Sequence, residues 1–529
     1  MLVKLYVMYN ELLKREVNMR TENAIKNISI SIFSQVVIIL LGFLSRKVFI
    51  DSLGTAYLGV NGLLTNVLSM MVLIEGGIGI SITYNLYKPL AENDQPKIIS
   101  LVQLYKKVYG ILALIIFILS IIIYPMIGRF AKGVDSISNL TLVYFIFVAK
   151  NMVSYITAYK WALINADQKG YVLSTANLVF QVITTIAKII ILYMTSNYII
   201  YLLVELGIYL VQVLFNGSIV NKRYPYIKTK QKYSLDNDVK DNIVTNVKAM
   251  FLHNIGGYCV AGTDNILLSY INITIVGLYS NYTMITGQLT ALISPILGGI
   301  SAGVGNLIAT ENNTKTYSVF QVAYLVNFWI YSLCIIFLYN LLEPFITWWL
   351  KDGLLLGKGT FLVILLNLYI SGMRSTVITF KSNAGLFVQD KYAPVIEGIL
   401  NLMISIILMK RFGMIGVFIG TTISTLIVPF WNQPRILFKY GFEVSVWEYF
   451  RKYLYYVVLT VLVGVLTTSI CNLVVVSNLF LSLVIKGLIC VGVINLCYIV
   501  IFFRTEEFKY LLNIIKPMAA KMKNKLAIN

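Results

Sequence analysis

Four basic side chains lie within long apolar segments of the chain or near the ends of such segments: Arg46, Lys150, Arg374 and Lys381. An ionisable group at membrane depth is costly, so it usually faces a cavity or a partner. Arginine offers bidentate contacts to phosphate and lysine a point charge. These cations predict a central cavity that holds an anionic group such as a diphosphate. For Arg46 and Lys381, snorkelling of the long side chain to the membrane surface is the alternative interpretation.

Acidic residues in the apolar segments predict a second kind of chemistry. Asp264, in GTDNILLS, is a candidate proton or sodium site, or the counter-ion of Arg46 in a gate. Glu75 is a further candidate for coupling or gating, but the small residues after it also favour close helix packing around a satisfied carboxylate. Lys188 and Glu205 lie at similar depth on successive segments, which predicts a structural ion pair between two helices.

The residues that a zinc site, a nucleotide-binding domain or a hydrolase would need are missing from the sequence. The chain has one histidine, His253, and five cysteines without a CxxC pair, so a zinc site has no support. Asp236 and Asp238 form a DxD pattern, but the loop around them is too short for a nucleotide-binding domain. No GxxxxGK[ST], GxSxG or HExxH motif occurs. We therefore expect no enzyme and no cofactor. The energy for any transport would come from coupling to H⁺ or Na⁺ or from downstream consumption of the product.

The elements that must position these residues are membrane-spanning helices. Of 529 residues, 58% are hydrophobic and only 12% are charged, which is unlike a soluble protein. A spanning helix needs about 20 mainly apolar residues. The sequence thus predicts an all-α polytopic membrane protein with about 14 such helices, at 28–50, 58–83, 108–127, 139–160, 172–194, 198–219, 248–270, 273–298, 318–342, 360–381, 393–411, 414–431, 453–472 and 479–503.

The long polar segments divide these helices into two six-helix lobes and a final pair. A weak internal repeat supports the two lobes: when Gly59 is aligned with Gly277, 218 residues later, Arg46 meets Asp264. Transporters often hold substrate between such repeats. We expect the parts to be an N-terminal segment 1–27, an N-lobe 28–219, an interlobe loop 220–247, a C-lobe 248–431, a linker and helix pair 432–503, and a basic tail 504–529.

The net charge of +20 follows from topology rather than from nucleic-acid binding. Most lysines and arginines fall at the two ends and in alternate loops, which the positive-inside rule places in the cytoplasm. Both termini are therefore expected to be cytoplasmic. Residues 1–18 do not read as a signal peptide, and Met19 is a candidate natural start.

Two stretches carry a resemblance to a known family. Residues 45–98, beginning SRKVFIDSLGTAYLGVNGLL, resemble the N-terminal region of bacterial polysaccharide-repeat-unit flippases, the Wzx-type transporters for O-antigen, capsule and exopolysaccharide. Residues 262–285, GTDNILLSYINITIVGLYSNYTMI, resemble the start of their second lobe. The arrangement of helices is similar to the wider superfamily of multidrug antiporters and lipid II flippases.

The resemblance implies a substrate and a setting. The chain would move an undecaprenyl-diphosphate-linked oligosaccharide from the inner to the outer leaflet of the bacterial cell membrane by alternating access. Glycosyltransferases and a polysaccharide polymerase would be its partners. Two alternatives remain: a multidrug or other lipid-linked-substrate antiporter of the same superfamily, and a membrane enzyme such as a repeat-unit polymerase. Short loops on the predicted outer side disfavour the enzyme.

Overall fold

The computed structural model describes residues 33–71, 75, 78–130, 137–167, 169–235, 262–350, 352–386 and 388–513. Within these residues the chain is helical and has no strand. Nine of the described helical segments are long and apolar enough to cross a membrane, or ten if the bent pair α5 and α6 is counted as one span. The chain is thus an all-helical polytopic membrane protein, as the sequence predicts.

These segments correspond to ten of the predicted spans. Of the other four, 273–298 lies within one long helix, α10 (Ile273–Thr310). The remaining three, 28–50, 58–83 and 248–270, each include residues outside the described ranges. His253, Asp236 and Asp238 also lie outside the described residues, as do the proposed start at Met19 and the end of the basic tail.

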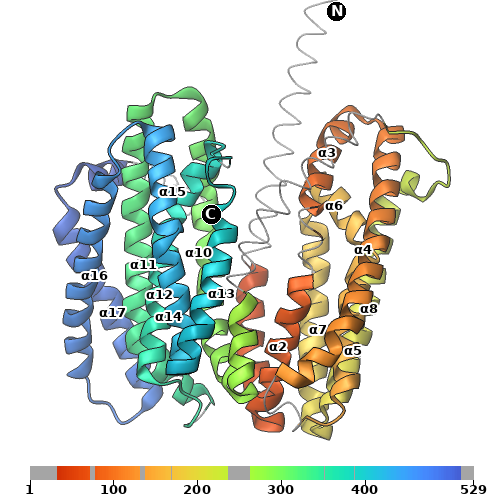
Figure 1. Ribbon diagram of the computed structural model, residues 1–529, viewed down its shortest axis with the longest axis horizontal. Helices are drawn as coiled ribbons and strands as arrows, with labels where there is room; N and C mark the ends of the chain where they lie inside the picture. The colour runs from red at the N-terminus through yellow and green to blue at the C-terminus, as the bar shows by residue number, and fades with distance from the viewer. Residues whose placement is uncertain are drawn as a thin grey trace, which may run out of the picture. The chain divides into compact units, whose positions relative to one another are not determined.

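The chain forms two compact units, Met1–Ser280 and Asn281–Asn529. The boundary between these units falls within α10. In the first unit, the 3₁₀ turn η3 (Pro225–Lys228), a helix over residues 33–53 and another over 262–271 accompany the helices that Figure 1 labels: α2 (Thr55–Met71), α3 (Ile78–Glu92), α4 (Gln95–Phe130), α5 (Leu140–Tyr155), α6 (Ala158–Ala166), α7 (Tyr171–Thr195) and α8 (Tyr198–Arg223).

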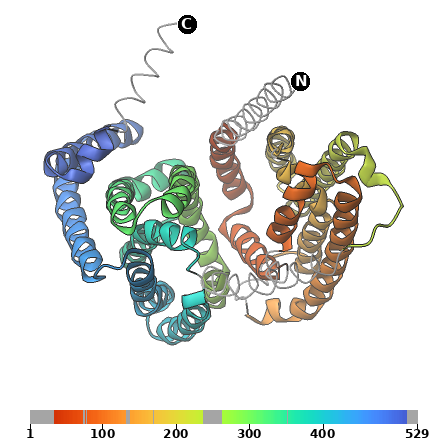
Figure 2. The ribbon, with the colours of Figure 1, turned by 90° about the horizontal axis from the view of Figure 1, so that it is seen from above.

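The second unit holds the rest of α10 and the elements after it. Seen from above, its helices form a bundle in which α16 and α17, at the blue end of the colour scale, lie side by side (Figure 2). The elements are α11 (Asn313–Leu350), α12 (Lys358–Asn383), η4 (Val388–Asp390), α13 (Ala393–Phe412), α14 (Met414–Ile427), α15 (Pro429–Leu437), the π-helical turn η5 (Phe438–Phe442), α16 (Trp447–Asn472) and α17 (Leu479–Phe502).

A tight turn sets the register of α7 and α8. Ser196 ends α7 in the left-handed conformation, at φ 45°. Asn197 then caps α8, because its side-chain oxygen accepts from the backbone N–H groups of Ile199 and Ile200 at 2.9 and 3.2 Å. A connection this short makes the two helices antiparallel neighbours. Side chains equally far from the turn, such as Lys188 and Glu205, therefore lie at the same depth.

Two glycines let α2 and α10 cross at backbone contact. A Cβ on Gly59 would collide with the carbonyl oxygen of Ile273, and one on Gly277 would collide with that of Thr55. Small residues permit this approach in membrane helices. The two contacts are reciprocal, since Gly277 follows Gly59, and Ile273 follows Thr55, by the same 218 residues. Gly59 and Gly277, which the internal repeat aligns, are thus the residues at which α2 and α10 touch.

The final helix pair belongs to the core of the second unit. Phe328 of α11 stacks on Tyr456 of α16 with ring centroids 4.1 Å apart, and Tyr498 of α17 lies 5.1 Å from the same phenylalanine. Trp329 Nε1 donates to Asn495 Oδ1 at 2.8 Å. The rings of Phe328, Tyr456 and Tyr498 are fully buried. This aromatic cluster joins α16 and α17 to α11.

Candidate functional site

A group of charged residues lies at membrane depth in the first unit. Glu205 of α8 accepts from two lysines: Lys188 Nζ of α7 lies 2.8 Å from Oε2, and Lys150 Nζ of α5 binds Oε1. The sequence suggested a pair between Lys188 and Glu205 and assigned Lys150 to a separate cavity. The structure instead brings all three together, so that one carboxylate serves two ammonium groups.

Tyr201 extends this group to Arg46. Its ring lies 4.5 Å from Lys188 Nζ, a cation–π contact, and Tyr201 lies within electrostatic range of Arg46. Tyr201 lies one helical turn before Glu205 on the same face of α8. We call Arg46, Lys150, Lys188, Tyr201 and Glu205 the cationic cluster. Its three cations and one carboxylate leave an excess of two positive charges.

The arginine of this cluster is held by neutral groups of α10. Arg46 Nη1 donates to Ser280 Oγ at 2.8 Å, and Nη2 to the Ser280 carbonyl at 3.5 Å. These contacts position the guanidinium without cancelling its charge. The guanidinium of Arg46 thus packs against α10, a helix far away in the sequence.

The other two acidic candidates, Asp264 and Glu75, each have a tyrosine neighbour. Asp264, half-buried on the helix over residues 262–271, interacts electrostatically with Tyr279, the residue before Ser280. Glu75 accepts a hydrogen bond of 3.0 Å from the buried hydroxyl of Tyr109 on α4. This hydrogen bond gives one oxygen of Glu75 a donor.

The two basic residues of α12 have partners within the second unit. Arg374 Nε and Nη2 donate to Gln433 Oε1 of α15 at 3.3 and 3.2 Å, and Glu397 of α13 interacts with the same guanidinium electrostatically. A carboxylate within a predicted span is the signal that identified Glu205. Glu397 carries the same signal, but the sequence analysis did not single out Glu397. Gln433 carries no comparable signal.

Lys381 is buried in an ion pair with Asp390, with side chains that are 5% and 3% exposed. The sequence predicts Lys381 as a cation of the substrate cavity, with snorkelling to the membrane surface as the alternative. In the structure the chain reverses after α12, and η4 brings Asp390 back onto the lysine. The positive charge of Lys381 is therefore neutralised within its own unit, and a substrate anion would have to compete with Asp390 for it.

No group of three or more His, Cys, Asp or Glu side chains in the described part of the chain could hold a metal ion. The chemistry of the cationic cluster is instead electrostatic. Lys150 is its accessible member, since 40% of its side chain is exposed against 17% for Lys188. An anion that approached Lys150 would meet an ammonium group whose carboxylate is shared with a second lysine.

Comparison with solved structures identifies the fold. A lipid II flippase, MurJ, in an inward closed conformation aligns with a TM-score of 0.64 and 15% identity, covering 90% of this chain and 99% of the flippase. The Vibrio cholerae MATE transporter VcmN aligns with a TM-score of 0.56 and 12% identity, over 81% of this chain and 99% of VcmN. An inward-facing multidrug resistance MATE transporter of the MOP superfamily aligns equally well, with 14% identity over 79% and 99%.

Comparisons of the sequence found no match. No protein-family profile matches the chain, and no curated protein sequence matches it. The identities to the solved structures are low, so the likeness concerns the arrangement of helices. The chain has the polytopic membrane fold that MurJ and the MATE transporters share.

Proposed function

We propose that the chain is a flippase that moves a lipid-linked oligosaccharide, carried on undecaprenyl diphosphate, across the bacterial cell membrane by alternating access. The observation that carries this proposal is the excess of positive charge in the cationic cluster. Charge at membrane depth is retained where it faces a substrate path. A diphosphate offers several acceptor oxygens and at least two negative charges, which matches the excess.

In this mechanism the protein forms no covalent bond with the lipid. Lys150 and Arg46 would draw the diphosphate out of the headgroup layer, while Glu205 and Tyr201 hold Lys188 in place behind them. The lipid tail would stay in the bilayer, and a change of conformation would expose the headgroup to the other side. Glycosyltransferases would supply this substrate in the cytoplasm, where the positive-inside rule places both termini, and a polymerase would consume it outside.

Ion coupling is the part of the proposal that rests on Asp264. Its carboxylate lies near Tyr279, next to the serine that holds Arg46. Uptake of a proton or sodium ion there would change the field around that arginine. Asp264→Asn should remove the dependence of transport on the ion gradient. Unchanged dependence would leave Asp264 as a structural counter-ion.

Neutralisation of Arg46 by an introduced carboxylate tests the role of its positive charge. In Ser280→Asp, a carboxylate replaces the neutral hydroxyl that accepts from Arg46, so the guanidinium becomes paired inside the protein. Purified variants in proteoliposomes would be assayed for flipping of a fluorescent short-chain prenyl-diphosphate oligosaccharide. We expect a loss of roughly tenfold or more, the value of one charged hydrogen bond. Ser280→Asn, of matched size and without charge, should retain transport.

Removal of charge tests Lys150 in the same assay. Lys150→Gln should lower flipping as Ser280→Asp does. The matched control is Lys169→Gln, because Lys169 is also ion-paired, to Asp167 at 2.6 Å, but lies in the turn before α7. Equal flipping by Lys150→Gln and Lys169→Gln would contradict the cationic-cluster mechanism.

The MATE likeness makes a multidrug antiporter the second candidate. That function requires binding of organic cations, which an excess of positive charge in the cluster opposes. Efflux of a cationic dye by the same proteoliposomes, without movement of the lipid, would favour the antiporter over the flippase.

A further inference from the structure

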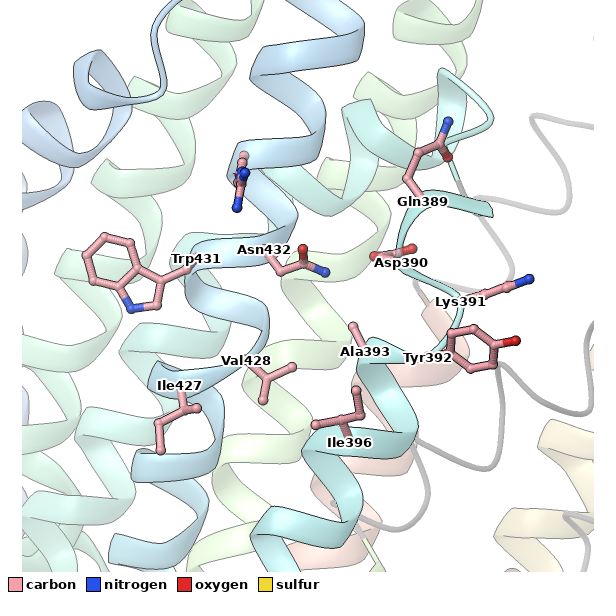
Figure 3. A pocket seen from close by; sticks show the side chains of 11 residues that line it. Gln389, Asp390, Lys391, Tyr392, Ala393, Ile396, Ile427, Val428, Trp431 and Asn432 are labelled. Atoms are coloured by element: carbon pink, nitrogen blue, oxygen red, sulfur yellow. The ribbon is translucent and has the colours of Figure 1, made fainter.

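An open cleft of about 410 Å³ lies in the second unit, and none of its lining residues belongs to the cationic cluster. It is formed where η4 leads into α13 and where α14 continues into α15 (Figure 3). This volume is in the range of small-molecule sites. Nothing in the proposed transport mechanism uses the cleft.

One wall of the cleft lies at the start of a candidate span. Ala393 and Ile396 in its wall belong to the first turn of a candidate span, Ala393–Phe412. The opposite wall, at Ile427 and Val428, lies where α14 ends and α15 begins, inside the span Met414–Phe442, so it is the α13 wall that places the cleft near the bilayer surface. Spans begin and end near the lipid headgroups. Trp431 points outward from the cleft, as an interfacial aromatic residue would (Figure 3).

The floor of the cleft offers an acceptor that is not used. Asp390 is 3% exposed, and its Oδ2 binds Lys381. Among the described residues, its Oδ1 has no hydrogen-bond partner. The side chains of Asp390 and Asn432 point toward each other across the floor (Figure 3). A buried carboxylate oxygen without a donor is expensive, so a hydroxyl that enters between these two residues would stabilise it.

The mouth of the cleft is positive. Lys391 and Arg435 line it and are exposed, whereas the negative charge of Asp390 is already neutralised by Lys381. The N-terminus of α13 also begins here, and Tyr392 at its N-cap makes no side-chain capping bond. Pro394 in this first turn has no N–H, and the other N–H groups of a helix start favour an anion. An occupant would thus carry an anionic group at the mouth and a hydroxyl at the floor.

We propose that this cleft binds the headgroup of an anionic phospholipid of the surrounding bilayer, with phosphatidylglycerol as the fitting class. Its phosphate would lie between Lys391, Arg435 and the start of α13. Its glycerol hydroxyls would reach Asp390 and Asn432, and its acyl chains would run along Ile396 and Ile427. Basic pockets between spanning helices recognise lipid headgroups in this way. The proposal is independent of what the chain transports.

Native mass spectrometry of the full chain in detergent tests the site. Phosphatidylglycerol would be compared with phosphatidylmethanol, which has the charge but not the hydroxyls, and with phosphatidylcholine. We expect retention in that descending order. Equal retention of the first two lipids would overturn the assignment of the floor. Competition by free glycerol phosphate at the same concentration as the lipid would show a soluble-phosphate site and would also overturn the proposal.

A charge-matched pair of variants separates the cleft from general surface attraction. Lys391→Gln with Arg435→Gln should weaken phosphatidylglycerol binding by roughly 30-fold, the value of two basic residues at an anionic surface. The control is Lys439→Gln with Arg411→Gln. Lys439 stacks on Tyr440 at 5.1 Å as Lys391 does on Tyr392 at 4.9 Å, but neither control residue lines the cleft. Equal losses in both pairs would refute the site.

Discussion

Lys150 and Lys188 bind opposite oxygens of one carboxylate, that of Glu205. The two lysines come from helices α5 and α7, which the chain places on either side of α8. A single carboxylate can neutralise only one of them. The arrangement therefore keeps a positive charge at membrane depth while both ammonium groups remain hydrogen-bonded.

The cluster predicts an order of stability among its variants. Glu205→Gln leaves two cations without their carboxylate and should lower the free energy of unfolding by about 3–5 kcal/mol. Lys150→Gln should cost only about 1 kcal/mol, because its side chain is 40% exposed. Thermal unfolding of the purified variants in detergent measures both. Similar melting temperatures for the two would contradict the burial argument.

The crossing of α2 and α10 predicts a glycine that cannot be replaced. Gly277→Ala places a Cβ against the Thr55 carbonyl, a backbone atom that cannot turn aside. The helices must separate, and we expect a loss of about 1–3 kcal/mol in unfolding experiments. Gly287, on the same helix, has nothing within 4 Å of an added Cβ. Gly287→Ala should therefore melt at or above the temperature of the unsubstituted chain.

The buried pair of Lys381 and Asp390 predicts a compensating double variant. Lys381→Met removes the partner of a carboxylate that is 3% exposed and should destabilise the chain by about 3–5 kcal/mol. Adding Asp390→Leu removes the stranded charge and should restore much of the stability. For comparison, Glu506→Gln breaks the exposed pair with Lys509 and should change stability by about 0.5 kcal/mol or less. A double variant as unstable as the single one would contradict this account.

A pH effect is expected outside the spans, where Glu507 follows α17 and pairs with Lys452 of α16. Burial raises the pKa of Glu507, but the hydrogen bond and charge of Lys452 outweigh it, so the pKa lies below the ordinary value of 4.5. The stability that this pair contributes is therefore present above pH 4.5 and is lost as the pH falls through the lowered pKa.

Glu507→Gln measures that contribution. The melting temperature of the unsubstituted chain should fall more steeply below pH 4.5 than that of the variant, and the two curves should converge in acid. Parallel curves over the whole range would show that the carboxylate of Glu507 titrates alike in the folded and unfolded chain.

Sequence alone predicts the contacts that a short turn imposes. Lys188 and Glu205 flank such a turn, so their equal depth follows from counting residues along two helices. Lys150 joins the same carboxylate from α5, and only the packing of α5 on α8 brings it there. Asp390 and Gln433 were likewise missed as partners of Lys381 and Arg374, since they come from a chain reversal and from a later helix. Polar partners of this kind depend on which helices are neighbours, and apolar periodicity does not specify neighbours.

The crossing of α2 and α10 also has a consequence for how the two helices came to fit. Each glycine meets the carbonyl four positions before the other, so one surface pattern is used twice. This is the isologous relation of a symmetric dimer, in which a patch is complementary to itself. Such a patch needs no second, separately shaped partner. Covalent linkage of the two copies in one chain adds only a high effective concentration to a fit that symmetry already supplies.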